Sequence, residues 1–404
     1  MLHIDFDGPR LIRREELRSA REVFKLCFGS GFDDSMDEAY APPPRGGWAV
    51  MLPASGPLQG RVVSQIGMDH HTLEFEHNSL FIGSIGGVST HPDFRNLGLA
   101  GRLLAHCTAA LRQEGARLLL ISGDRGLYLR TGNVPAMCFD SFILQSNPAL
   151  QAALRGNVTV RMLTEADAPA CARIHQSDPV HYLRQAEMYR SEFYPGGSWM
   201  VELDGKPAGY LLMRIPWEFE DDAQCGVREV NDYAGSRETL VEGIKLLLSG
   251  GCEAFNQFNI RELRLDAAWQ DTQFTRCLAE MGTRQEPIPL PGHTMRLINF
   301  PALRGDLEAY IAGRLPEALT PDLRFEQSGP LLVDPGQAQA GDGQCAIVWQ
   351  QQRLELATAE MTRLVMGSPQ QAPGAGYPGV PSVLGQIISA LFPLPSFLPG
   401  LNYR

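Results

Sequence analysis

A strand that runs through a short turn into a long helix constrains this chain more than any other feature of its sequence. The segment reads Ile85-Gly-Gly-Val-Ser-Thr-His-Pro-Asp-Phe-Arg-Asn-Leu-Gly-Leu-Ala-Gly-Arg102. Apolar and β-branched residues predict a strand over 81–89, and apolar residues at helical spacing predict a helix over 99–114 that Gly115 ends. A helix is predicted over 10–28 from apolar residues at helical spacing, and further strands over 48–52, 60–68, 118–122 and 138–144. This alternation indicates an α/β layered domain.

The turn has the chemistry of a phosphate-binding loop. Its Arg95-x-x-Gly98-x-Ala100 sequence stands where the helix begins, and glycine lets a backbone approach a ligand closely. The free N–H groups of a first helical turn attract an anion, and Arg95 or Arg102 would add a full positive charge. The segment contains neither G-x-G-x-x-G nor G-K-[ST], the two commonest phosphate loops. The alternative is a strand-to-helix connection that binds no ligand.

The rest of the chain divides into two further units. Its 404 residues are enough for two or three domains, and 44% hydrophobic residues can form several cores without disulfides or a metal. From about residue 158 a capped helix, a hairpin at Asp204-Gly205, a helix over 236–249 and a strand over 262–266 repeat the order of the first unit. A third unit of helices and strands follows Pro301 and begins with a helix predicted over 303–314. We therefore predict domains at 1–150, 151–300 and 301–404.

Charge and cysteine content indicate which classes of protein to exclude. The formal net charge of −11 argues against nucleic acid as a partner and suits a cationic ligand. Eight scattered cysteines without a C-x-x-C pair are typical of reduced thiols in a cytoplasmic protein. No stretch approaches the ~18 apolar residues of a membrane span, and residues 1–14 are too charged for a signal peptide. We expect a cytoplasmic protein that binds no membrane.

With Val88 before the turn, the R-x-x-G-x-A segment resembles the acetyl-CoA signature of the GCN5-related N-acetyltransferase (GNAT) superfamily. In that superfamily the strand splays from its neighbour beside the turn and its backbone binds the pantetheine arm. The resemblance implies that Val88 and Thr90 hold pantetheine through main-chain groups. It also implies that the turn wraps the pyrophosphate with Arg95, Asn96, Gly98, Leu99, Ala100 and Gly101.

A second segment narrows the resemblance from the whole superfamily to one family within it. Ser122-Gly-Asp-Arg-Gly-Leu-Tyr-Leu-Arg-Thr-Gly-Asn-Val-Pro-Ala136 is similar to a signature of the enhanced-intracellular-survival (Eis) acetyltransferases, and it adds Ser122 to the expected cofactor-binding residues. Those enzymes have a catalytic GNAT domain, a degenerate GNAT domain and a sterol-carrier-like domain, and they assemble as hexamers. The expected fold class is therefore α+β, with two mixed-sheet α/β-layered GNAT domains followed by a sterol-carrier-like α+β domain, in a homo-oligomer.

Acetyl transfer from acetyl-CoA to an amine needs a base and an acid. A lysine-like amine with a pKa of ~10.4 must lose a proton as it attacks, and the departing thiolate must gain one. A phenol can donate that proton, and the resemblance points to Tyr128 as the acid; the alternative is a half-buried structural tyrosine. In the resembled family the base is the chain's own terminal carboxylate, which is that of Arg404 here. A tail with prolines and apolar residues over 392–403 is accordingly expected to pack into the cleft of the first domain.

Two further charged clusters are candidates for other roles. The acceptor cleft of this fold lies where a loop carries four acids, which would bind a cationic amine or simply be solvated: Asp33, Asp34, Asp37 and Glu38. The segment 69–77 contains His70, His71 and His77, but adjacent strand residues face opposite ways, so a solvated hairpin is favoured over a metal site. No metal cofactor is expected.

Two functions of different class follow from these patterns. The first is an acetyl-CoA-dependent N-acetyltransferase that acts on a primary amine, with aminoglycoside, polyamine, lysine and small amine acceptors all open. The second is a binding module that holds an apolar ligand in its third domain. The second domain is expected to be structural, because the start of its equivalent helix lacks R-x-x-G-x-A and has Asp232 and Glu238 nearby, which would repel a pyrophosphate.

Overall fold

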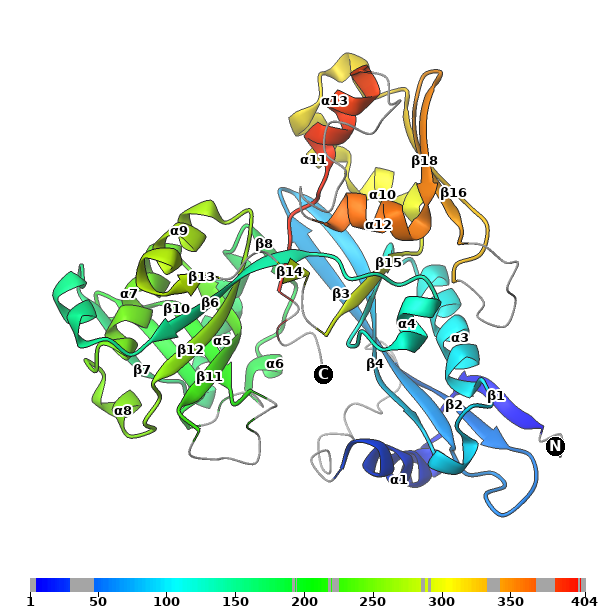
Figure 1. Ribbon diagram of the computed structural model, residues 1–404, viewed down its shortest axis with the longest axis horizontal. Helices are drawn as coiled ribbons and strands as arrows, with labels where there is room; N and C mark the ends of the chain where they lie inside the picture. Colours follow the sequence, from blue (N-terminus) through cyan, green and yellow to red (C-terminus); the bar gives the residue numbers. More distant parts are fainter. Residues whose placement is uncertain are drawn as a thin grey trace.

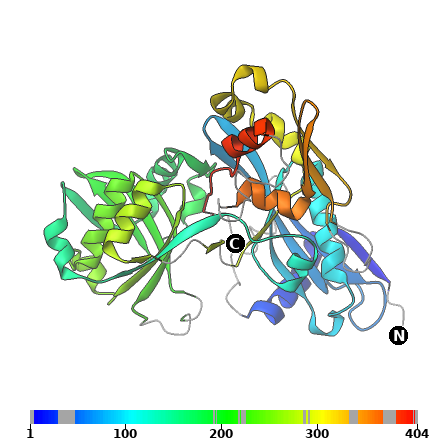
Figure 2. The same ribbon diagram turned by 45° about the horizontal axis from the view of Figure 1, so that its top comes forward.

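The computed structural model contains three β-sheets with helices packed on them, grouped into three lobes (Figures 1 and 2). It describes residues 5–29, 47–190, 193, 195–216, 219, 225–284, 288–289, 292–332, 342–367, 382–398 and 400. Within these ranges no helix is long and apolar enough to cross a membrane. This multi-domain α+β architecture is the predicted fold class.

The first sheet has the strand order β1-β2-β3-β4-β5-β15, with β8 added beside β3. Its strands are β1 (Phe6–Leu11), β2 (Gly47–Pro53), β3 (Ser64–Phe75), β4 (Asn78–Thr90), β5 (Leu118–Ile121), β8 (Val180–Tyr182) and β15 (Thr294–Leu297). Alternate residues of β2 contact different helices: Ala49 and Met51 join the cluster under α3 (Leu99–Gln113), and Trp48 and Val50 join the cluster under α1 (Leu17–Phe28). The two helices therefore cover opposite faces of this sheet.

The predicted helix over 10–28 is wrong in its first turns. Arg10 and Leu11 belong to β1 and pair with Val50 and Ala49. A short 3₁₀ turn follows at Arg14–Glu16, and α1 begins only at Leu17. The apolar residues around position 11 fit both a strand and a helix, and pairing with β2 decides between them.

The second sheet has the order β13-β6-β12-β11-β10-β9-β7, with β14 beside β6. Its strands are β6 (Cys138–Gln145), β7 (Val158–Met162), β9 (Ser198–Leu203), β10 (Lys206–Arg214), β11 (Val227–Gly235), β12 (Glu262–Ala268), β13 (Thr283–Arg284) and β14 (Ile288–Pro289). The helices α5 (Ala168–Gln176), α6 (Glu187–Arg190), α7 (Arg237–Leu248), α8 (Glu253–Asn256) and α9 (Thr272–Met281) accompany it.

The first and second sheets exchange strands. β6, whose sequence we expected in the first unit, crosses to the second sheet and pairs with β12 from Gln145–Glu262 to Phe139–Ala268 (Figure 1). In return β15, from the predicted second unit, completes the first sheet beside β5. The domain boundaries at 150 and 300 remain predictions. Both larger sheets contain strands from either side of residue 150, whereas no sheet of the described residues contains strands from both sides of residue 300.

The repeat predicted from the order of elements is visible in the connections. In the first sheet the parallel strands β4 and β5 are joined through α3, and in the second the parallel strands β11 and β12 are joined through α7 and α8. In the second sheet α7 begins almost directly after β11, whereas in the first a 3₁₀ turn at Pro92–Phe94 and residues 95–98 separate β4 from α3. The second unit thus has the same local plan as the first.

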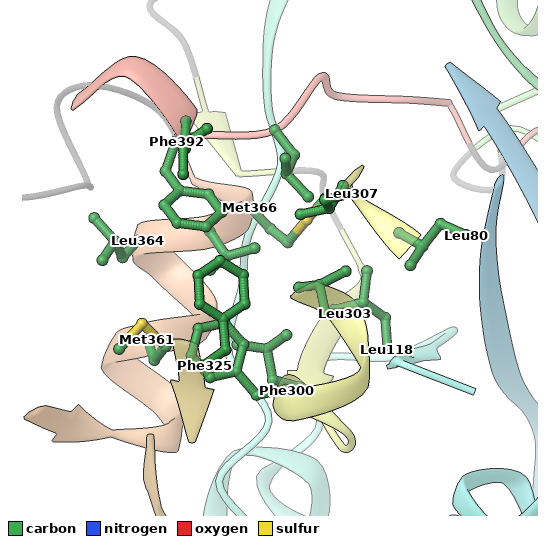
Figure 3. Packing of buried hydrophobic residues seen from close by; sticks show 14 of the residues in the cluster. Leu80, Leu118, Phe300, Leu303, Leu307, Phe325, Met361, Leu364, Met366 and Phe392 are labelled. Atoms are coloured by element: carbon green, nitrogen blue, oxygen red, sulfur yellow. The ribbon is translucent and has the colours of Figure 1, made fainter. Parts of the chain in front are cut away.

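The third sheet, of β16 (Leu323–Ser328), β17 (Gln344–Trp349) and β18 (Gln352–Ala357), packs against four helices. These are α10 (Phe300–Asp306), α11 (Glu308–Arg314), α12 (Thr358–Met366) and α13 (Ser382–Leu391), and the helix predicted over 303–314 is in fact divided at Leu307. Phe300 and Phe325 stack with their ring centroids 4.6 Å apart, and Met361, Leu364 and Phe392 surround them (Figure 3). The same core continues to Leu80 and Leu118 of the first sheet.

Candidate functional site

The candidate site lies where β4 and β5 part. The two strands pair in parallel from Ile82–Leu118 to Ile85–Ile121, and the N–H of Ser122 donates a last bond to the carbonyl of Ile85 at 3.1 Å. Beyond this point β4 continues to Thr90 beside β3, whereas the chain after Ser122 turns away into α4 (Gly126–Arg130). No strand of the described chain pairs with that edge of β4 over 86–90. The edge is therefore available to an extended ligand.

A β-bulge bends β4 at the same place. The register with β3 shifts between the pairs Gln65–Ser89 and Gly67–Gly86, so Gly87 and Val88 stand opposite one residue. Gly87 has φ +59°, and a side chain there would clash with the ring of Trp48. Glycine is required here because only it combines this left-handed backbone with contact to a buried tryptophan. The bulge turns the backbone of Val88 away from the regular ladder.

The start of α3 is built to receive an anion. Asn96 and Gly98 both have positive φ, +64° and +75°, and Gly98 is the N-cap with no side chain capping the helix. A Cβ placed on Gly98 or Gly101 would meet no described atom within 4 Å. Backbone in this alternating conformation, followed by the unpaired N–H groups of a first helical turn, forms a concave anion site. The residues fit the diphosphate of a coenzyme A, and the space that it needs is open.

Arg95 stands beside this turn with an exposed guanidinium. Its Nε donates to the carbonyl of Thr90 at 3.3 Å, and that carbonyl also accepts from the Cys27 thiol at 3.4 Å. The Thr90 hydroxyl is bonded to Ser64 at 2.8 Å. The main-chain oxygen of Thr90 is thus already used within the protein, which leaves Val88 as the more available of the two expected pantetheine partners.

Tyr128 lies on α4, just past the point of splay. Its side chain is 5% exposed and packs in one cluster with Ile85 and Val88. A Cβ on Gly123 would lie 2.5 Å from the ring, so the ring rests directly on that glycine. Burial raises the pKa of the Tyr128 phenol above its ordinary value of 10, which keeps it protonated at neutral pH. No hydrogen bond to its hydroxyl is found in the described part of the chain.

Replacing Gly98 with glutamate should weaken acetyl-CoA binding at least about tenfold, because it adds bulk and a negative charge at the anion site. Isothermal titration calorimetry measures the affinity, and circular dichroism checks the fold. Gly205→Glu is the matched control, since Gly205 also has positive φ (+71°) and open space around it, but lies in the β9–β10 hairpin. Equal affinities in the two variants would move the cofactor site elsewhere.

The structure brings most of the predicted site residues to this splay. Around it lie Val88, Thr90, Arg95, Asn96, Gly98, Leu99, Ala100, Gly101, Ser122 and Tyr128. The predicted base Arg404 and the predicted acceptor residues Asp33, Asp34, Asp37 and Glu38 lie outside the described residues. Sequence reasoning missed Gly123, whose role depends on contact with a ring five residues later.

The histidines of β3 are not part of a solvated hairpin. His70 faces α3 and contacts Glu114 at 2.5 Å, whereas His71 points to the other face, is buried, and bonds the Ser84 hydroxyl at 2.8 Å. Burial lowers the pKa of His71 to about 3, so its imidazole is neutral. Over the described ranges no group of three or more His, Cys, Asp or Glu is placed to hold a metal ion.

The equivalent place in the second sheet is filled by the protein itself. Where β11 ends and α7 begins, the N–H of Gly235 donates to the Asp178 carboxylate at 3.0 Å. Arg237 bonds Asp178 and Asp271 at 3.1 and 2.6 Å and lies over the ring of Tyr233 at 5.3 Å. An internal carboxylate thus occupies the position of an anionic ligand. Of the two acids expected to repel a pyrophosphate, Asp232 is paired with Arg184, and Glu238 accepts a hydrogen bond from the neutral amide of Gln273.

This splay, bulge and anion-binding helix start suit an extended cofactor that carries a phosphate group. Residues 9–132 match the family model of the acetyltransferase (GNAT) domain, and domains of this family use acetyl-CoA as co-substrate. The chain is an acetyltransferase with a GNAT domain in its first sheet.

Solved structures of similar fold cover nearly the whole chain. A probable N-acyltransferase from Enterococcus faecalis is 11% identical with a TM-score of 0.64, over 96% of this chain and 97% of that one. A GCN5-related N-acetyltransferase from Kribbella flavida is 14% identical with a TM-score of 0.61, over the same shares. Eis1 from Mycobacterium abscessus is 14% identical with a TM-score of 0.60, over 100% of both chains. At these identities the likeness concerns the fold. None of the curated proteins that were compared matches the sequence.

Proposed function

We propose that this protein transfers an acetyl group from acetyl-CoA to a primary amine by direct attack in a ternary complex. One observation carries the proposal: the unpaired edge of β4 at Val88 leads on one side to the anion-binding start of α3 and on the other to the buried phenol of Tyr128. A coenzyme thioester has its diphosphate and its reacting sulfur at two separate places. The chain offers a suitable group for each.

The residues divide the chemistry between them. The N–H groups at the start of α3 and the Arg95 guanidinium would hold the diphosphate, and the main chain of Val88 would hold the pantetheine arm. Acetyl-CoA supplies an activated thioester, whose carbonyl carbon the amine nitrogen attacks while the C–S bond breaks. Tyr128 would give its proton to the departing thiolate, since a phenol kept neutral by burial is a ready donor. The terminal carboxylate of Arg404 is the proposed base that takes the proton of the amine.

The class of acceptor is proposed from the negative charge of the protein. An overall charge of −11 favours a cationic amine, and the acids Asp33, Asp34, Asp37 and Glu38 are proposed to contact it. Aminoglycosides, polyamines and lysine side chains all meet this description. We also propose the tandem GNAT and sterol-carrier-like organisation and a homo-oligomer, on the basis of the resemblance to the Eis acetyltransferases and the full-length similarity in fold.

A thiol-release assay tests the proposal. The intact protein is mixed with acetyl-CoA and with one amine of each class, and free CoA is followed with a thiol reagent. Release that depends on both protein and amine, with an acetamide found by mass spectrometry, is the expected result. Absence of release with every amine, in protein that binds acetyl-CoA, would favour the apolar-ligand module instead. The packed core around Phe300 and Phe325 gives that alternative no support (Figure 3).

A further inference from the structure

The segment after α13 leaves the third lobe and runs between the two larger sheets (Figure 1). The N–H of Leu394 donates to the carbonyl of Val365 at 2.8 Å, which ties the start of the segment to α12. Farther along, the ring of Phe397 meets Tyr182 of β8 edge-on at 5.4 Å, and Leu398 packs against the cores of both the first and the second sheet. We call residues 392–398 and 400 the docking segment.

Gln270, which follows β12 of the second sheet, holds the backbone of this segment from two sides. Its Nε2 donates to the carbonyl of Leu394 at 3.1 Å, and its Oε1 accepts from the N–H of Ser396 at 3.4 Å. One amide side chain thus satisfies a donor and an acceptor two residues apart, as the neighbouring strand of a sheet would do. Such contacts recognise an extended backbone and depend little on its side chains.

A buried ion pair meets the segment at Gly400. Arg184 and Asp232 are 2% exposed each and joined at 2.7 Å, and the Tyr210 hydroxyl also donates to Asp232, at 3.0 Å. Gly400 lies so close that a Cβ would clash with Asp232 Oδ1 and stand 2.9 Å from Arg184 Nη2. Its φ of +49° also favours glycine. Since a buried ion pair held by several bonds cannot give way cheaply, this position excludes a side chain.

We infer that the second unit serves as the receptor of the C-terminal segment, with Gln270 and the Arg184–Asp232 pair as its contact groups and Gly400 as the residue that fits them. The unit keeps the plan of an acetyltransferase domain, but its own anion position is filled by Asp178. The docking itself rests only on these contacts. Its effect on turnover rests on the proposed function, in which the segment leads to the terminal carboxylate.

Gly400→Ala tests the receptor in the full-length protein. Hydrogen–deuterium exchange followed by mass spectrometry should show the amides of 392–398 exchanging at least about tenfold faster than in the wild type, as expected for a segment released from its site. Gly205→Ala is the matched control, because it carries a similar positive φ (+71°) with nothing within 4 Å, and it should leave this exchange unchanged. Unchanged exchange in Gly400→Ala would overturn the inference.

Gln270→Ala tests the docking of the segment independently of Gly400. Because Gln270 is partly exposed, its replacement leaves the Arg184–Asp232 ion pair intact. It too should speed exchange over 392–398. Gln257→Ala is the control and should not, because the Gln257 amide donates to the nearby Ala254 carbonyl, away from this segment. Exchange as slow as in the wild type would again contradict the receptor.

Measuring kcat in the Gly400→Ala and Gln270→Ala variants distinguishes failure of this inference from failure of the proposed function. If the segment is released and kcat falls about 10²-fold with the KM for acetyl-CoA unchanged, both stand, because loss of a general base has that size. If the segment is released and kcat is unchanged, the receptor stands and the terminal carboxylate is not the base.

Discussion

Tyr128→Phe is expected to lower kcat by about 10²–10⁴-fold, the range for loss of a general acid. The ring fills the same space on Gly123 and in the cluster with Ile85, so the variant loses only the proton donor. Affinity for acetyl-CoA should therefore stay within about twofold, because the diphosphate contacts are untouched. Steady-state kinetics and calorimetry on the same preparations measure the two quantities.

The pH dependence gives this prediction a second signature. Burial raises the pKa of Tyr128 above 10, so the proton is retained until the pH exceeds that value. A fall in kcat caused by ionisation of Tyr128 should therefore occur only above pH 10. The pH profile of the Tyr128→Phe variant should not show this fall. Tyr182→Phe is the control: its buried hydroxyl has no partner within the described chain, and its removal should leave kcat unchanged. A wild-type kcat in Tyr128→Phe would demote Tyr128 to a packing residue.

Deleting Asn402–Arg404 is expected to abolish most turnover, because it moves the chain's only α-carboxylate away from its place. A short tag added after Arg404 should act in the same way, since it converts that carboxylate to an amide. Acetyl-CoA binding should be unaffected in both proteins, because the groups around Gly98 and Val88 are intact. Rates in the thiol-release assay and affinities by calorimetry test this.

The same tag placed before Met1 is the control and should leave activity unchanged. If the end of the chain only seals the core of the third lobe, the deletion would instead lower the melting temperature and leave the rate per folded molecule as it was. Full activity with the C-terminal tag would rule out the terminal carboxylate as base.

Much of the fold is predictable because most of its helices and strands are determined by the residues within or next to them. Apolar spacing, the glycine at position 115 and the hairpin at Asp204-Gly205 place α3, β9 and β10 to within a residue or two. The strand β11 is not predicted because it contains the charged residues Arg228 and Asp232. Both are buried, and Asp232 is paired with Arg184, which lies far from it in the sequence. A strand's sequence also does not say which sheet it joins, so the exchange of β6 and β15 could not be foreseen.

The residues of the site can also be divided into those that local sequence predicts and those that it does not. The anion-binding turn is readable from Arg95, Gly98 and Ala100, because close backbone approach and a free helix start are local properties. The burial of His71 and the contact of Gly400 with Asp232 are made by segments that meet only in the folded chain, and the contact of Gly123 with the Tyr128 ring depends on the turn that leads into α4. Composition and spacing contain no sign of them. The structure alone relates these residues to the site.

The exchange of strands sets an order of events during synthesis. When residue 150 has left the ribosome, β5 still lacks its neighbour β15 at 294–297, and β6 lacks its neighbour β12 at 262–268. Both edges therefore stay open until about twice that length of chain has been made, and open edges invite pairing with other nascent chains. Arg296, fully buried on β15, in turn bonds Asp342 of the third lobe. The first sheet is thus completed only when β15 has been made, long after its other strands, although most of its sequence lies in the first third of the chain.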